Sequence, residues 1–172
     1  MYQLQIFKPQ SFAKDGQFQG AAMSLQLGNA PKGKAVYLSL VRQKSWDTAK
    51  RLGSFYNNKD EGQSARIKFN EIEVGGLISA IRLYENWSGF HSFDDNKTQI
   101  TFSTYQKKAK EGEKEGAKAF SLTVSRNGLK IGLGIERSEA EAIRVFLEQS
   151  LVEMMRASYE QSNSAEFREA NK

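Results

Sequence analysis

The sequence has no cysteine and only one histidine among its 172 residues. Without cysteine the chain can form neither a disulfide nor a thiolate metal site, and a single histidine argues against a zinc site or a catalytic triad. No apolar run is long enough to span a bilayer, and residues 1–6 lack the regions of a signal peptide. These absences predict a protein without enzymatic activity, cofactor, metal or membrane contact.

Positive charge is concentrated in the first part of the chain. Residues 1–70 contain 11 Lys+Arg and 4 Asp+Glu, whereas residues 138–172 contain 4 and 7. This asymmetry would attract a polyanion to the first part and repel it from the C-terminal segment. Lysines that only keep the protein in solution explain the same excess. Charge alone leaves both interpretations open.

Two parts of the sequence contain the same kinds of segment in the same order. In each part, three segments alternate apolar and polar residues, which is typical of half-buried strands, and a helix follows. The strand segments are residues 23–27, 36–42 and 65–69 in the first part, and 98–102, 120–126 and 129–133 in the second. The sequence therefore predicts an α+β fold of duplicated β-sheet-plus-helix units, with antiparallel sheets packed around two central helices.

One domain is expected over residues 1–157, with repeats at about 20–87 and 93–157, because this length suffices for one buried core. Residues 158–172 are polar and predict a flexible tail. The repeats differ in their connections. Residues 43–64 form a long connection in the first repeat, where the second has only Asn127-Gly128, a pair that predicts a tight type I′ hairpin.

Both predicted helices begin with capping-box spacing, Asn70 with Glu73 and Ser138 with Glu141. Gly75-Gly76 inside the first helix favours close approach of the two helices, with a kink or a frayed first turn as the alternative. Apolar residues at helical spacing predict buried faces. They are Ile72, Leu77, Ala80, Ile81 and Tyr84 in the first helix, and Ala142, Ile143, Phe146, Leu147, Leu151, Met154 and Met155 in the second.

The polar side of the predicted strands carries the residue types that bind single-stranded nucleic acid, namely cations for phosphates, hydroxyls for sugars and aromatics for stacking. The candidates on strands are Tyr37, Arg66, Lys68, Thr101, Tyr105 and Lys130, with Arg42 and Arg126 at equivalent strand ends. The long connection adds Lys44, Trp46, Lys50, Arg51, Phe55 and Tyr56. Trp46 and Phe55 fit a loop anchor packed into the core equally well.

Four further residues follow the first predicted helix. Trp87, Phe90 and Phe93 are predicted to lie in the core. His91 has no triad or metal partner in the pattern, which indicates a structural, hydrogen-bonding role.

The duplicated unit resembles the Whirly and positive-cofactor-four superfamily of single-stranded DNA-binding proteins. The likeness spans about residues 20–157 and rests on the order of segments, including residues 65–70 and 130–135 that run into the two helices. The resemblance implies curved antiparallel sheets whose helices cross at the centre, with strands of DNA on the outer β-surfaces and little sequence preference. It also implies homo-oligomers that act in replication, recombination, repair or transcription.

The leading hypothesis is therefore a non-enzymatic single-stranded DNA-binding protein inside the cell, in the cytoplasm or at the nucleoid. One alternative is RNA binding, because stacking on aromatics does not distinguish the two sugars. The other is a protein-interaction scaffold that dimerises through the apolar stripe of the second helix and binds no nucleic acid.

Overall fold

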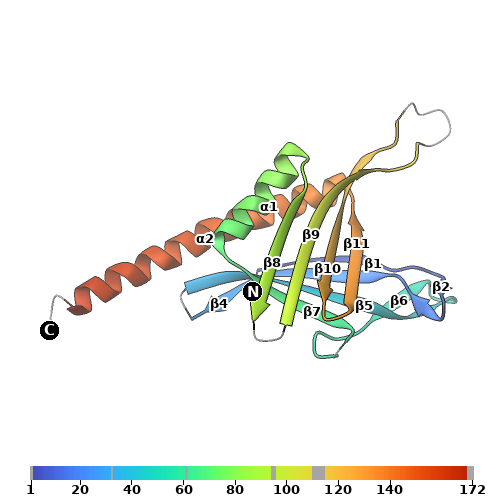
Figure 1. The fold of residues 1–172 in the computed structure, drawn as a ribbon, viewed down its shortest axis with the longest axis horizontal. Helices are drawn as coiled ribbons and strands as arrows, with labels where there is room; N and C mark the ends of the chain where they lie inside the picture. The colour runs from blue at the N-terminus through green and yellow to red at the C-terminus, as the bar shows by residue number, and fades with distance from the viewer. Residues whose placement is uncertain (1, 32, 61, 94–95, 110–114, 170–172) are drawn as a thin grey trace.

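The computed structural model describes residues 2–31, 33–60, 62–93, 96–109 and 115–169. Two antiparallel sheets run across one another, and two helices pack beside them (Figure 1). Sheet 1 has the strand order β1-β4-β5-β7, with β6 paired to the C-terminal part of β5, and sheet 2 has the order β8-β9-β10-β11. The α+β class and the antiparallel sheets predicted from the sequence are confirmed.

Over the described residues, each half of the chain has four sheet strands in matching order, followed by one helix. The first half contains β1 (Gln3–Lys8), β4 (Ala21–Ala30), β5 (Gly33–Asp47), β7 (Ser64–Phe69) and α1 (Glu71–Leu83). The second half contains β8 (Trp87–Phe93), β9 (Asn96–Gln106), β10 (Lys118–Arg126), β11 (Leu129–Ile135) and α2 (Arg137–Glu169). The first half also has the short strands β2 (Ala13–Lys14), β3 (Gln17–Phe18) and β6 (Leu52–Phe55), which have no counterpart among the described residues of the second half.

The predicted repeats of 20–87 and 93–157 each leave out one sheet strand, because β1 precedes the first repeat and β8 precedes the second. In β1, Ile6 is buried while Gln5 and Phe7 are not, so the strand has the same alternation as the others. The tight turn at Asn127-Gly128 is confirmed, since both residues have positive φ, 46° and 82°.

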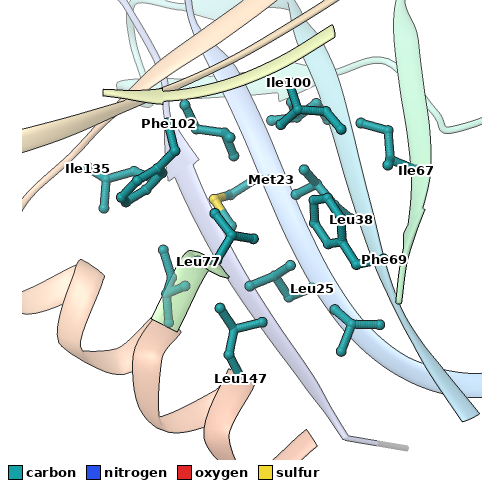
Figure 2. Packing of buried hydrophobic residues seen from close by; sticks show 14 of the residues in the cluster. Met23, Leu25, Leu38, Ile67, Phe69, Leu77, Ile100, Phe102, Ile135 and Leu147 are labelled. Atoms are coloured by element: carbon teal, nitrogen blue, oxygen red, sulfur yellow. The ribbon is translucent and has the colours of Figure 1, made fainter. Parts of the chain in front are cut away.

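One hydrophobic cluster joins the two sheets and both helices. Figure 2 shows Met23 and Leu38 of sheet 1, Phe102 of sheet 2, Leu77 of α1 and Leu147 of α2 meeting in it. Each strand contributes the residues of one parity, so burial of this face drives the sheets and helices together. We propose that residues 1–157 form a single domain, because this cluster spans both halves.

The capping box is confirmed for α1 and wrong for α2. The Glu73 backbone N–H donates to Asn70 Oδ1 at 2.9 Å, and the Asn70 backbone N–H donates to Glu73 Oε2 at 3.0 Å. At α2, the Glu136 backbone N–H donates to the Glu139 carboxylate at 2.7 Å. The helix therefore starts at Arg137, ahead of the predicted cap Ser138.

Two predictions for α1 are wrong, the burial of Ile72 and the role of the glycine pair. Ile72 is 84% exposed, since it lies in the first turn and points away from the sheets. The glycine pair does not bring the helices together. A Cβ on Gly76 would lie 2.5 Å from Trp87 Nε1, so this glycine makes room for the Trp87 ring, and Gly75 faces open space.

The buried face of α2 is confirmed at Ile143, Phe146, Leu147 and Met154, whereas Ala142 and Met155 are exposed. The helix continues through residues 158–169, beyond the end predicted from its polar sequence, and its last part projects from the sheets (Figure 1). Neither α1 nor α2, as far as the described residues extend, is apolar enough to cross a membrane.

The residues after α1 join sheet 2 to the helix. Trp87 packs edge-on against Phe69 with ring centroids 6.0 Å apart, as a core residue does. His91 Nε2 lies 2.5 Å from Glu73 Oε1, which confirms a hydrogen-bonding role. Phe90 is 63% exposed, so its predicted burial is wrong, because it occupies the outward parity of β8. The side chain of Phe93 lies outside the described residues.

Two aliphatic residues of α1 provide a matched test of this core. We expect Leu77→Ala to lower the free energy of unfolding by about 2–5 kcal/mol, because it opens a cavity between the sheets and helices. Ile72→Ala should change it by less than about 0.5 kcal/mol, since the side chain is in water. Urea denaturation followed by circular dichroism measures both, and equal losses would contradict the assigned helix face.

Candidate nucleic-acid interface

The outward side chains of sheet 1 form three rows across its strands. Because the strands are antiparallel and in register, residues of one parity stand side by side on this outer face. The rows are Gln3-Gln26-Tyr37-Lys68, Gln5-Ser24-Ser39-Arg66 and Phe7-Ala22-Val41-Ser64. Two rows end in a cation on β7, so this face combines small polar groups with positive charge.

Three predicted candidates, Tyr37, Arg66 and Lys68, come together in these rows. The Arg66 guanidinium lies 4.8 Å from the centroid of the Tyr37 ring, and the Tyr37 hydroxyl donates to the Asn29 carbonyl at 3.0 Å. A Cβ on Gly28 would lie 3.1 Å from the same ring, so the tyrosine lies flat along β4. The sheet therefore holds an arginine stacked on an aromatic ring.

A groove lies on the same face, where the chain after β6 passes over the sheet. We call it the β6 groove. Its floor comes from the rows of β1, β4 and β5, its wall comes from residues 55–58, and its volume is about 190 Å³. The residues that line it are Gln5, Phe7, Ala22, Met23, Ser24, Ser39, Val41, Phe55, Tyr56, Asn57 and Asn58.

Aromatic rings stand at the edges of the β6 groove. Phe7 is 54% exposed and its ring centroid lies 5.5 Å from that of Phe55. The Lys44 ammonium lies 5.9 Å from the centroid of Tyr56. The predicted candidates Phe55 and Tyr56 thus lie next to an exposed phenylalanine ring and a lysine ammonium, respectively.

The remaining candidates of the long connection lie farther along the β5–β6 ribbon. Trp46 is half-buried opposite Gly53, and Lys50 and Arg51 occupy an exposed turn. Buried Gln43 fixes this ribbon, since its side-chain amide donates to the Gln10 carbonyl and its oxygen accepts from the Gln10 backbone N–H, at 2.9 and 2.7 Å. The ribbon is therefore an ordered extension of sheet 1.

Arg42 and Arg126 connect the two sheets. Arg42 of β5 donates to the Lys130 carbonyl of β11 at 3.0 Å, and Arg126 of β10 donates to the Arg66 carbonyl of β7 at 2.9 Å. Arg126 Nε also donates to the Thr98 hydroxyl at 2.7 Å. Each arginine thus lies on the third sheet strand of one half and holds the fourth strand of the other.

The other candidates lie on a different surface. Thr101 and Tyr105 point outward from β9 in sheet 2, and Lys130 is exposed on its edge strand β11. A Cβ on Gly134 would lie 3.0 Å from the Tyr105 hydroxyl, so this ring lies across the sheet. Since the inner faces of both sheets meet in the core, their outer faces point away from each other. The structure divides the predicted residues between two surfaces.

A second hollow marks the seam between the sheets. It has a volume of about 350 Å³ and lies between the β2–β3 hairpin and the edge of β11. Arg42, Lys130, Gln17 and Phe18 line it. In the ranges that the structure describes, no three His, Asp or Glu side chains are grouped so that they could hold a metal ion.

Several groove residues were missed by the sequence analysis. Gln5 and Phe7 belong to β1, whose alternation with Leu4 and Ile6 was a usable signal. Asn57 and Asn58 lie in the loop after β6, and only the fold places them above the sheet. No sequence pattern marked them.

Comparison with known proteins adds one finding. No protein-family model matches the chain, and no curated protein matches it. Among solved structures, the crystal structure of WHY1 from Arabidopsis thaliana is similar with a TM-score of 0.53 and 14% identity, over 97% of this chain and 94% of that one. At this identity the likeness shows the fold alone. The chain therefore has a Whirly-like fold, as the resemblance in its sequence predicted.

Proposed function

We propose that the protein is a non-enzymatic single-stranded DNA-binding protein, largely independent of sequence, that acts in replication, recombination, repair or transcription. The outer face of sheet 1 carries this proposal. It places Tyr37, Phe7 and Tyr56 beside Arg66 and Lys68 on one continuous surface. We call this surface, with the β6 groove, the sheet-1 platform. The proposed strand is DNA rather than RNA, and the proposed location is the cytoplasm or the nucleoid.

The chemistry of the sheet-1 platform suits a single strand. Every base has a face that stacks on an aromatic ring, and arginine or lysine neutralises the phosphates between them. Lys44, Lys50 and Arg51 on the ribbon extend the positive surface beyond the groove. In this proposal Arg42 and Arg126 act mainly by holding the sheets, since their guanidinium groups already donate to backbone carbonyls.

The outer face of sheet 2 is the alternative surface on which a single strand could lie. It is made largely of hydroxyl residues and glycine, such as Thr101, Thr123 and Gly132 in one row. Its outward cations include Lys97 and Lys130, but in the described residues it has no counterpart of the ribbon that adds Lys44, Lys50 and Arg51 to sheet 1. The proposal therefore places the strand on sheet 1 and leaves Thr101, Tyr105 and Lys130 outside the main contact.

The proposal includes a homo-oligomer formed through α2. Four large apolar side chains of this helix are more than half exposed, and three of them recur every seven residues. They are Val145, Val152, Met155 and Tyr159. A seven-residue apolar repeat is the spacing by which helices of two chains pack together.

Charge on this stripe should therefore separate the subunits. We expect Val152→Glu to lower the molar mass measured by light scattering to that of one chain, because a carboxylate cannot be buried unpaired between helices. Ser79→Glu, on the exposed side of α1, is the control and should leave the mass unchanged. A Val152→Glu protein with the wild-type mass would contradict the α2 interface.

A pair of tyrosine substitutions tests the position of the strand. We expect Tyr56→Ala to weaken binding of a fluorescein-labelled single strand by about 1–3 kcal/mol, because it removes a stacking surface at the β6 groove. Tyr105→Ala, on the outer face of sheet 2, should change the affinity little. Fluorescence anisotropy measures both, and the opposite order would move the strand to sheet 2.

Salt dependence tests the phosphate contacts. Binding should weaken as salt rises, because the cations of the sheet-1 platform release counterions from the strand. We expect Lys68→Gln to reduce the slope of log K against log salt by about 0.7, the value for one phosphate contact with a single strand. Lys97→Gln, on β9 of sheet 2, should keep the wild-type slope. An unchanged slope for Lys68→Gln would remove this residue from the interface.

A further inference from the structure

The β6 groove exists because the first half of the chain has an insertion that the second lacks. In the second half, β10 and β11 are joined by the two residues Asn127 and Gly128. In the first half, the corresponding connection leaves β5, forms β6 and returns over the outer face before β7 begins. A two-residue turn is too short to form such a wall over sheet 2, and the groove gives sheet 1 a feature beyond general stacking.

The insertion holds its shape through its own hydrogen bonds. The Ser64 hydroxyl donates to the Asn58 carbonyl at 2.9 Å, and the Asn57 backbone N–H donates to the Asp60 carboxylate at 2.7 Å. The Tyr56 backbone N–H donates to the Arg42 carbonyl at 3.0 Å, which joins the loop to β5. The wall of the groove is thus preorganised above the sheet.

The size of the groove limits what it can hold. Its volume of about 190 Å³ is below the range of about 300–1,000 Å³ that is usual for drug-sized ligands. Small residues, Ala22, Ser24 and Ser39, keep the floor low, while the rings of Phe7 and Tyr56 stand at the sides. These dimensions suit one flat ring system between the two aromatic rings.

Polar groups in the groove are unused by the protein. Ser39 lines the floor, and its hydroxyl makes no hydrogen bond within the described ranges and is open to the groove. The exposed side-chain amides of Gln5, Asn57 and Asn58 line the same groove and are likewise without a protein partner there. Polar groups that open into a groove in this way are available to fix the orientation of a ligand.

We propose that the β6 groove binds a single adenine base of a bound strand. A carboxamide offers one donor and one acceptor side by side, which matches the N6 amino group and N7 of adenine. Guanine presents two acceptors at that edge and prefers arginine or lysine, and no cation lines the groove. The inference rests on the proposed function, and it adds one position of base selection to a platform that is otherwise indifferent to sequence.

The test uses oligothymidylates of about 16 nucleotides, all-dT or with one central nucleotide changed to dA, dG or dC. Anisotropy with the full-length protein should give an affinity at least about fivefold higher for the dA strand than for all-dT, the range expected for one well-placed base contact. The dG and dC strands should stay within about twofold of all-dT. Because guanine is also a purine, the dG strand controls for the stronger stacking of a larger base.

Two variants locate the preference. Ser39→Met fills the floor of the groove and should reduce the ratio of the dA affinity to the all-dT affinity to less than about twofold, whatever its effect on all-dT itself. Thr123→Met places the same side chain at the equivalent position of β10 and should keep the preference. Asn57→Ala removes one exposed amide without touching the core, and it should also lower the dA preference.

The outcomes separate the two proposals. Equal affinity of the wild-type protein for all four strands would overturn the adenine pocket and leave single-strand binding intact. A dA preference that persists in both Ser39→Met and Asn57→Ala would also overturn it, because the selected base would then lie elsewhere. Failure to bind any of the strands would overturn the proposed function itself.

Discussion

The structure depends on the burial of one parity of both sheets in a common core. Leu38 of β5 and Leu122 of β10 point inward, while Ser39 and Thr123 beside them point outward. A shift of one residue in either strand would exchange these sets, so the apolar pattern fixes the register. The same constraint determines which side chains face outward. It leaves two outer faces, which carry candidates such as Tyr37 and Tyr105.

The duplicated architecture makes the two halves similar, and the insertions make them different. Arg42 and Arg126 hold the sheets together by related contacts, each reaching a backbone carbonyl of the other half. The hairpin β2–β3 and the β5–β6 ribbon belong to the first half and have no counterpart in the part of the second half that the structure describes. Both lie at the same end of the molecule (Figure 1), and both border hollows that candidate residues line. The asymmetry of the fold therefore supports one main binding face.

Much of the fold was predictable from the sequence because its signals are local. Alternation marked the strand from Val36 onward, Asn127-Gly128 marked the hairpin, and Asn70 with Glu73 marked the start of α1. The failures have two causes. Gly76 accommodates Trp87 on the next strand, a contact that the helix pattern alone does not reveal. At α2, a local contact between the Glu136 backbone N–H and Glu139 competes with the equally plausible cap at Ser138 and moves the start of the helix. For the candidate site, strand parity placed Tyr37 and Arg66 on one face, but it could not separate the face of sheet 1 from that of sheet 2. Asn57 gained its position only from the path of the insertion over the sheet.

The central claim is that a single strand lies on the outer face of sheet 1. Amide hydrogen exchange of the protein, with and without an excess of single-stranded DNA, tests it most directly, because it reports on both faces in one experiment. The account predicts slower exchange in the loop at residues 55–58 and along β4 and β5, with little change in β9 and β10. Protection confined to β9 and β10, or protection of neither sheet under conditions in which the strand binds, would contradict it.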